Sequence, residues 1–293
     1  MPAMLQMILS MVIFGTIAIF RQFIPLPSSF IAMMRGLIGA IFLLIVMAVR
    51  RQKLDWAGIK KNFLKLCISG VFLGVNWILL FEAIIYAGPS VATLCYYLAP
   101  IFIIIVSPFI LKEKLTAKKV VCIGVALVGM IFVSGILKGA EGVQFKGVLL
   151  GLAAAVFYAS VVLTNKKIVG ISANDRTVMQ LSVSTIVLLP YVLLTEKGVI
   201  AEFAASDFKV IAMLVLVGIV HTGLAYALYF GSIKTIKAQT AAILSYIDPV
   251  LTLVLSALFR IDRIDAFGII GAVLVLGAAI VSELPGRHKK ELP

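Results

Sequence analysis

The sequence predicts an all-α integral membrane protein with ten transmembrane helices in two inverted five-helix repeats. Its composition, its apolar runs and an internal repeat lead to this prediction. Hydrophobic residues make up 62% of the chain and charged residues 13%, whereas soluble proteins are roughly one quarter charged. Because lipid leaves only helices and closed barrels as spanning structures, and the apolar runs are long and continuous, we expect helices.

Ten apolar runs follow one another along the chain, and each can cross a hydrocarbon core of about 30 Å. Short polar or charged loops separate them. The first run lacks the basic segment and the cleavage site of a signal peptide, so we expect a retained span in a chain that begins at Met1. We expect helices at roughly residues 3–20, 29–49, 63–87, 90–110, 118–137, 147–165, 177–195, 208–233, 238–259 and 264–283.

The loops carry most of the charge. The net charge of +13 does not indicate a nucleic-acid partner, because the cations crowd short segments beside the spans. Most of the 26 Lys and Arg residues fall on the inner side when the N-terminus is placed inside. This bias predicts a multi-pass protein with both termini in the cytoplasm. Cys67, Cys95 and Cys122 lie in apolar runs at unrelated spacings, which predicts buried thiols and no disulfide or metal site.

An offset of 149 residues relates the two halves of the chain. The stretch CYYLAPIF at residues 95–102 returns as LSYIDPVL at residues 244–251. The matched pairs are Gly74 and Gly223, Trp77 and Tyr226, Phe81 and Phe230, Tyr97 and Tyr246, Pro100 and Pro249, Glu113 and Asp262, and Lys114 and Arg263. Shared composition explains matching aliphatic residues but not this pattern, so the sequence favours a duplication.

Each repeat therefore holds five spans, the first at residues 1–137 and the second at residues 147–283. An odd number of spans inserts the second copy upside down. Inverted repeats recur in transporters, whose substrate site lies at the repeat interface near the middle of the membrane.

The stretches GPSVATLCYYLAPIFIIIVSPFILKEKLT and TAAILSYIDPVLTLVLSALFRIDRID, each at the same place in its half, resemble the EamA-type members of the drug/metabolite transporter superfamily. The resemblance covers nearly the whole chain. It implies an inner-membrane carrier, commonly an exporter of amino acids and other small metabolites, with a central cavity between the halves and peripheral fifth and tenth helices. Small multidrug relatives carry a glutamate in their first span, whereas residues 4–20 here hold no ionisable side chain. Their proton/drug antiport is therefore not carried over.

Four ionisable residues lie inside the expected spans and are candidates for coupling or gating: Arg35, Glu82, His221 and Asp248. A charge at the centre of a bilayer costs about 2.5–3.5 kcal/mol on insertion scales, so such groups face a cavity or a partner. Counting about 1.5 Å per residue puts Arg35 and Glu82 in the outer half, where they can pair, and His221 and Asp248 near the middle, where they can share a proton. Structural roles, an ion pair or a histidine bonded to a carbonyl, are the alternatives.

Asp248 has further support from its own helix. Thr252 and Ser256 follow at intervals of four and share its face. Pro249 removes a backbone donor and frees the carbonyl of Ser245, as Pro100 frees that of Tyr96. A freed carbonyl is tolerated in lipid only where protein or cavity water satisfies it. We therefore expect both prolines beside a central cavity.

The substrate-binding candidates combine aromatic rings with polar groups near the middle of their spans. Alternatively, these side chains simply pack between helices. The candidates are Asn76, Trp77, Tyr97, Tyr158, Tyr226, Tyr246 and Asp248.

The sequence favours a secondary transporter for a small polar or zwitterionic solute, and the family resemblance implies that it exports amino acids or similar small polar metabolites by alternating access. We expect a small-molecule solute and membrane lipid as partners, no cofactor, and a monomer and not an obligate oligomer. The first alternative is efflux of hydrophobic cations, favoured by the aromatic residues together with Glu82 and Asp248. The second is a membrane-embedded enzyme for a lipid-linked substrate, but the sequence offers no metal-ligand cluster, no nucleophile beside a base and no phosphate-binding glycine loop.

Overall fold

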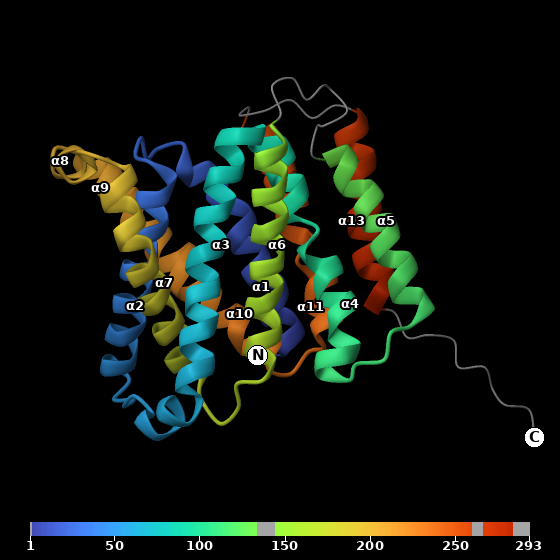
Figure 1. Ribbon diagram of the computed structural model, residues 1–293, viewed down its shortest axis with the longest axis horizontal. Coiled ribbons are helices and arrows are strands. Elements are labelled where there is room, and N and C mark those ends of the chain that lie inside the picture. Colours follow the sequence, from blue (N-terminus) through green and yellow to red (C-terminus); the bar gives the residue numbers. More distant parts are fainter. Residues whose placement is uncertain (1, 134–143, 260–265, 284–293) are drawn as a thin grey trace, which may run out of the picture.

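The computed structural model describes residues 2–133, 144–259 and 266–283, and no strand occurs among them. They form a bundle of helices (Figure 1). The first half contains α1 (Ala3–Arg21), α2 (Ser28–Val49), α3 (Trp56–Tyr96), α4 (Ala99–Leu111) and α5 (Ala117–Val133). The second half contains α6 (Phe145–Lys166), α7 (Ala173–Thr195), α8 (Val199–Ala204), α9 (Phe208–Leu216), the π-helix η2 (Val217–Leu224), α10 (Ala225–Ile233), α11 (Ala238–Leu244), α12 (Ile247–Leu258) and α13 (Ala266–Glu283).

Seven helical stretches among the described residues are long and apolar enough to cross a membrane, which makes this a multi-pass membrane protein. They coincide with seven of the ten expected spans. The seven are Ala3–Arg21, Ser28–Val49, Trp56–Gly88, Val91–Leu111, Phe145–Lys166, Ala173–Thr195 and Phe208–Ile233.

The other three expected spans differ in form from the prediction. The fifth is described only as far as the end of α5, a helix of 17 residues, and residues 134–137 lie outside the described ranges. The ninth is not one continuous helix, because α11 ends at Leu244 and α12 begins at Ile247. The tenth corresponds to α13, whose 18 residues include an apolar stretch from Ala266 to Ala278. The count of ten spans therefore stays a prediction.

Local sequence sets where several helices begin. The Asp55 carboxylate accepts a hydrogen bond of 2.9 Å from the Gly58 amide at the start of α3. The Ser172 hydroxyl accepts one of 3.1 Å from the Asp175 amide at the start of α7. Such caps satisfy amides that have no partner within the helix. Gly88 has φ +76°, which glycine adopts without strain, so the chain reverses there between the third and fourth spans.

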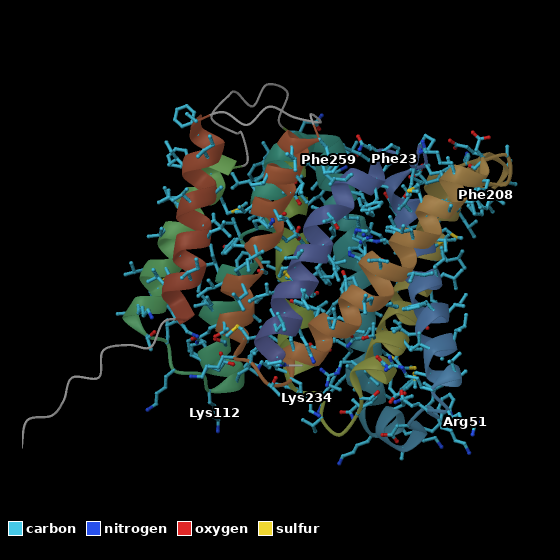
Figure 2. The ribbon with its side chains drawn as sticks, turned by 180° about the vertical axis from the view of Figure 1, so that it is seen from behind. Phe23, Arg51, Lys112, Phe208, Lys234 and Phe259 are labelled. Carbon is cyan, nitrogen blue, oxygen red and sulfur yellow. The ribbon has the colours of Figure 1, made fainter. Side chains whose placement is uncertain are left out.

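The two ends of the bundle differ in charge. Figure 2 shows Arg51, Lys112 and Lys234 at one end, which we call the basic end. Phe23 and Phe208 lie at the opposite end, which we call the far end (Figure 2). α1 runs from the basic end to the far end, and α6 runs the other way (Figures 1 and 2).

A buried arginine ties three segments together near the basic end. Arg176 is 1% exposed, although it precedes the span that was expected at residues 177–195. Its guanidinium donates to the carbonyls of Asn165 and Phe230 at 3.3 Å and of Ile168 at 3.0 Å. Asn165 and Phe230 lie in the last turns of α6 and α10, where carbonyls without helical partners favour a cation. The positive charge of Arg176 is thus compensated by backbone carbonyls at helix ends and not by a carboxylate.

α5 and α13 lie side by side at one edge of the bundle (Figure 1). The rings of Phe132 and Phe267 stack with centroids 5.8 Å apart. This is the peripheral place that the family resemblance implies for the fifth and tenth helices. The remaining helices surround the middle of the bundle, so the candidate site is to be sought among them.

Glycines bring α2 and η2 into backbone contact. A Cβ atom built on Gly39 lies 2.9 Å from the Gly223 amide nitrogen and 3.1 Å from the Gly218 carbonyl oxygen. A Cβ atom on Gly218 lies 2.6 Å from that of Ile38. Backbone atoms cannot rotate away as the end of a side chain can. Glycine is therefore required at this contact by space, since its backbone conformation there is helical.

We expect Gly39→Ala to lower the free energy of unfolding by about 1–3 kcal/mol, because overpacking between backbones forces the helices apart. Thermal unfolding of the purified protein in detergent measures the effect. Gly277→Ala is the matched control, since a Cβ atom there meets nothing within 4 Å. A loss of stability as large for Gly277→Ala as for Gly39→Ala contradicts the packing argument.

Candidate functional site

A cavity of about 340 Å³ lies in the middle of the bundle, between helices of both halves. Its aromatic lining residues are Phe14, Trp77, Phe81, Tyr96, Tyr97, Tyr158 and Tyr226. Its polar and charged lining residues are Arg35, Thr93, Ser245, Asp248 and Thr252. Met11, Ile17, Leu80, Ala99 and Pro100 complete the lining. A pocket with aromatic walls and a few polar groups is the usual form of a small-molecule site.

Two helix breaks face this cavity. α3 ends at Tyr96 and α4 begins at Ala99, while α11 ends at Leu244 and α12 begins at Ile247. Pro100 and Pro249 lie in the first turns after the breaks, where a missing backbone donor costs nothing. The spans expected as continuous helices at residues 90–110 and 238–259 are therefore each interrupted, and a new helix starts at an equivalent place in each. The Ser245 carbonyl is not free as expected, because it accepts from the Asp248 amide at 3.4 Å.

Asp248 lies in the first turn of α12 and lines the cavity. Its carboxylate accepts from the Thr252 hydroxyl at 3.4 Å, at the limit of a hydrogen bond. The same hydroxyl lies 3.1 Å from the Gly15 carbonyl oxygen, which is the better acceptor by distance. Asp248 therefore has only a weak side-chain partner among the described residues. The side chain of Ser256, the third member of the expected polar face, lies outside the described part of the chain.

Arg35 lies on α2 at another part of the cavity wall. Its guanidinium carbon is 4.6 Å from the centre of the Trp77 ring, and its buried Nε has no hydrogen-bond partner. The expected pairing with Glu82 does not occur, because Glu82 accepts a hydrogen bond of 2.5 Å from the Tyr191 hydroxyl. Glu82 joins α3 to α7 and is not part of the cavity lining. Depth along the helix was predicted, but the face of each helix was not.

His221 lies in η2 and is not among the residues that line the cavity. Its Nε2 is 2.9 Å from the Thr16 hydroxyl, its ring packs against Phe20 at 4.9 Å, and its Nδ1 is buried without a partner. The expectation that His221 and Asp248 share a proton is therefore not what the structure shows. His221 joins η2 to α1 instead.

Two further candidates from the sequence lie beside the cavity and do not line it. Asn76 donates to the Ala154 carbonyl at 2.6 Å and so joins α3 to α6. Tyr246 is 0% exposed, and its hydroxyl donates to the Tyr97 carbonyl at 2.9 Å. The Tyr246 hydroxyl and the Asn76 amide nitrogen thus bond a neighbouring backbone, while the Asn76 amide oxygen is buried without a partner; neither residue is part of the cavity lining. Trp77, Tyr97, Tyr158, Tyr226 and Asp248 do lie together in the lining.

Sequence reasoning missed the contribution of α1. Phe14 lines the cavity and packs edge-on against Tyr226, with ring centroids 5.0 Å apart. Nothing in the first apolar run marks Phe14 as different from its neighbours. Phe14 shares a helix face with Met11 and Gly15, but residues three and four positions apart share a face in every helix, so this spacing does not single out Phe14.

A smaller cavity of about 200 Å³ continues toward the far end. It shares Ile17, Arg35 and Phe81 with the central cavity and reaches Arg21 and Ser28, beside the loop that carries Phe23 (Figure 2). Arg35 therefore stands at the junction of the two cavities.

The opposite side of the central cavity is closed by hydrogen bonds. The hydroxyls of Tyr158 and Tyr229 lie 2.6 Å apart, and Tyr229 is about one turn nearer the basic end than Tyr226. Closer to that end, the Glu113 carboxylate accepts from the amides of Ala238 at 2.8 Å and Gln239 at 3.3 Å. Glu113 thus caps α11 from the segment after α4, a role that its loop position did not reveal.

More bonds hold the same layer. The Gln239 amide donates to the Ser107 hydroxyl at 3.0 Å, and the Lys166 ammonium donates to the Ile236 carbonyl. These bonds join α4 and α6 to the start of α11. The cavity therefore leads toward the far end and is shut toward the basic end.

Comparisons with known proteins agree with a transport role for proteins of this kind. The model of the EamA-like transporter family matches residues 1–135 and 145–283. The uncharacterized transporter YxxF of Bacillus subtilis (strain 168) is 30% identical over 275 residues, which cover 93% of this chain and 86% of that protein. A protein named probable amino-acid metabolite efflux pump in Escherichia coli (strain K12) is 26% identical over 219 residues, or 72% of this chain and 73% of that protein.

A solved crystal structure shares the fold. It superposes with a TM-score of 0.84 at 20% sequence identity, and the match covers 96% of both chains. At this identity the likeness concerns the fold alone.

We expect Glu113→Ala to speed hydrogen exchange of the Ala238 and Gln239 amides by roughly tenfold or more. A hydrogen bond to a charged group contributes about 1.5–3 kcal/mol, and about 1.4 kcal/mol corresponds to a factor of ten. Mass spectrometry of deuterium uptake measures the change. Glu202→Ala, an exposed carboxylate on α8, is the control. Unchanged exchange at the start of α11 in Glu113→Ala contradicts the capping role.

Proposed function

The chain belongs to the EamA-like transporter family, and from this premise we propose that it exports amino acids or similar small polar metabolites across the cytoplasmic membrane by alternating access. It acts as a secondary transporter, as a monomer in lipid, with the solute as its partner.

One observation carries this proposal. The central cavity takes its lining from both stretches that match the family model, with Trp77 and Tyr97 from the first and Tyr226 and Asp248 from the second. A site between two halves is accessible from one side or the other as the halves rock against each other. The closed layer at Glu113 and the continuing cavity at Arg21 correspond to a state open toward the far end.

We place ten spans in two inverted repeats, at residues 1–137 and 147–283. The opposite directions of α1 and α6 support the inversion (Figures 1 and 2). So does the packing, because Gly74 of α3 approaches Val187 of α7, and Gly223 of η2 approaches Gly39 of α2. Residues 74 and 223 differ by the repeat offset, and α2 and α7 are each the second span of their half.

The basic end faces the cytoplasm in this proposal, together with both termini. Arg51, Lys112 and Lys234 gather there (Figure 2). Lys and Arg in short loops remain on the cytoplasmic side during insertion. The state described by the structure is then open to the outside.

The names of two relatives favour amino acids as the solute, since proteins of Escherichia coli (strain K12) and Salmonella typhimurium (strain LT2) are named probable amino-acid metabolite efflux pumps. Efflux of hydrophobic cations is the second candidate, because aromatic faces and Asp248 suit a cation. Arg35 in the same lining weighs against it, since a cationic solute is repelled by a cationic wall. The relatives are named as transporters, and an enzymatic role is not proposed.

Inside-out membrane vesicles test the function, because export from cells becomes uptake into such vesicles. We expect vesicles that contain the protein to accumulate at least one of a panel of labelled amino acids faster than vesicles without it. Labelled tetraphenylphosphonium tests the second candidate in parallel. Accumulation of the cation and of no amino acid contradicts the proposed substrate class.

We expect Asp248→Asn to reduce uptake at least tenfold while leaving expression and unfolding temperature unchanged. The substitution keeps the size of the side chain and removes the charge that a solute ammonium group or a coupling proton needs. Asp207→Asn is the matched control, because Asp207 precedes α9 at the far end, remote from the cavity. Wild-type uptake by Asp248→Asn contradicts the assignment and makes Asp248 a structural residue.

A further inference from the structure

Two opposite charges share the lining of the central cavity without forming an ion pair with each other or with any other described residue. Arg35 lies on α2 and Asp248 on α12. Each charge is costly to hold in a membrane without compensation. If the two side chains met, they would neutralise each other, but aromatic walls stand around them and no contact joins them.

The geometry of Arg35 leaves its donors available. Its guanidinium carbon lies 4.6 Å from the centre of the Trp77 ring, and no described residue accepts a hydrogen bond from the guanidinium. A guanidinium carries five N–H donors in its own plane. The buried Nε has no partner, and Glu82, the acid that was expected to pair with Arg35, is bonded to Tyr191. A guanidinium with free in-plane donors matches a carboxylate in bidentate fashion.

The surroundings of Asp248 offer acceptors. The Ser245 hydroxyl donates to the Ala242 carbonyl at 2.6 Å, and the Thr252 hydroxyl donates to the Gly15 carbonyl at 3.1 Å. Both hydroxyls therefore use their protons within the protein and keep lone pairs for a ligand. Ser245, Asp248 and Thr252 all line the cavity. Three acceptors, one of them charged, suit the three donors of an ammonium group.

We infer that the cavity binds a zwitterion, with the carboxylate of the solute at Arg35 and its ammonium group at Asp248. The inference rests on the proposed transport function and goes further by naming the charges of the solute and the residue that receives each. A solute with one charge compensates one wall and leaves the other charge unpaired, which costs affinity. Only a ligand that carries both charges satisfies both walls.

α-Amino acids and ω-amino acids share this chemistry and differ in the distance between their charges. Leucine and 6-aminohexanoate are isomers that represent the two cases. The analogues with one charge are 4-methylpentanoate and hexanoate, which lack the ammonium group, and 3-methylbutylamine and hexylamine, which lack the carboxylate.

Calorimetric titration of the purified protein in detergent with these six compounds tests the inference. We expect at least one isomer to bind at least tenfold more tightly than both of its single-charge analogues. Arg35→Gln should lower the affinity of that zwitterion at least tenfold and leave the matching amine unchanged or tighter. Asp248→Asn should lower the affinity of the same zwitterion at least tenfold and leave unchanged the affinity of the matching carboxylate analogue, which lacks the ammonium group. Lys209→Gln, which removes a cation from the face of Phe23 outside the cavity, should change nothing.

The binding measurements test the inference, and the vesicle uptake measurements test the transport function, so that each can fail without the other. If neither isomer binds, if single-charge analogues bind as tightly, or if Arg35→Gln keeps the full preference for the zwitterion in a protein of unchanged unfolding temperature, the inference is overturned. If Arg35→Gln does not fold, Arg35→Lys replaces it, because lysine keeps the charge but loses the bidentate fork; an unchanged affinity then overturns the inference as well. Selective binding in a protein that gives no uptake in vesicles overturns the exporter function and leaves the inference standing.

Discussion

The rule that every backbone polar group in lipid needs a partner determines where this bundle can be irregular. The helix breaks before Pro100 and Pro249 leave amides and carbonyls outside a regular helix, and both breaks lie beside the central cavity. Protein groups supply part of what is missing, since the Tyr246 hydroxyl donates to the Tyr97 carbonyl. Irregular backbone at membrane depth is tolerated only where protein or a water-filled cavity surrounds it. The cavity and the breaks therefore require each other.

The same rule explains how the bundle holds charge. Arg176 is compensated by carbonyls at helix ends, and Glu113 by amides at a helix start. Both charges thus act on helix termini and stabilise the fold. Arg35 and Asp248 have no comparable compensation among the described residues, which separates the charges that build the bundle from those that line the cavity.

The sequence was informative about helix boundaries and much less so about helix faces. Apolar length located six spans to within a few residues, the third begins at Trp56 and not at residue 63, and the two prolines indicated where the chain is irregular. Depth alone could not show that Glu82 faces α7 or that His221 faces α1, because both choices depend on the rotation of a helix about its axis. The face of His221 is harder still to predict, because it lies in the π-helix η2. A π-turn contains more residues than an α-turn and so shifts the faces of the residues that follow. The capping role of Glu113 was missed for another reason. Its partners are backbone amides, and because almost every residue carries one, the residue types at positions 238 and 239 do not indicate the contact.

The cap that Glu113 places on α11 also bears on the rate at which the basic end can open. Two hydrogen bonds to a carboxylate, at about 1.5–3 kcal/mol each, must break before the basic end can open. If they break together in the slowest step, the opening is slower by a factor of roughly 10² to 10⁴ than in a protein without the cap. A single side chain in a short loop would then set how long the cavity stays closed toward the basic end.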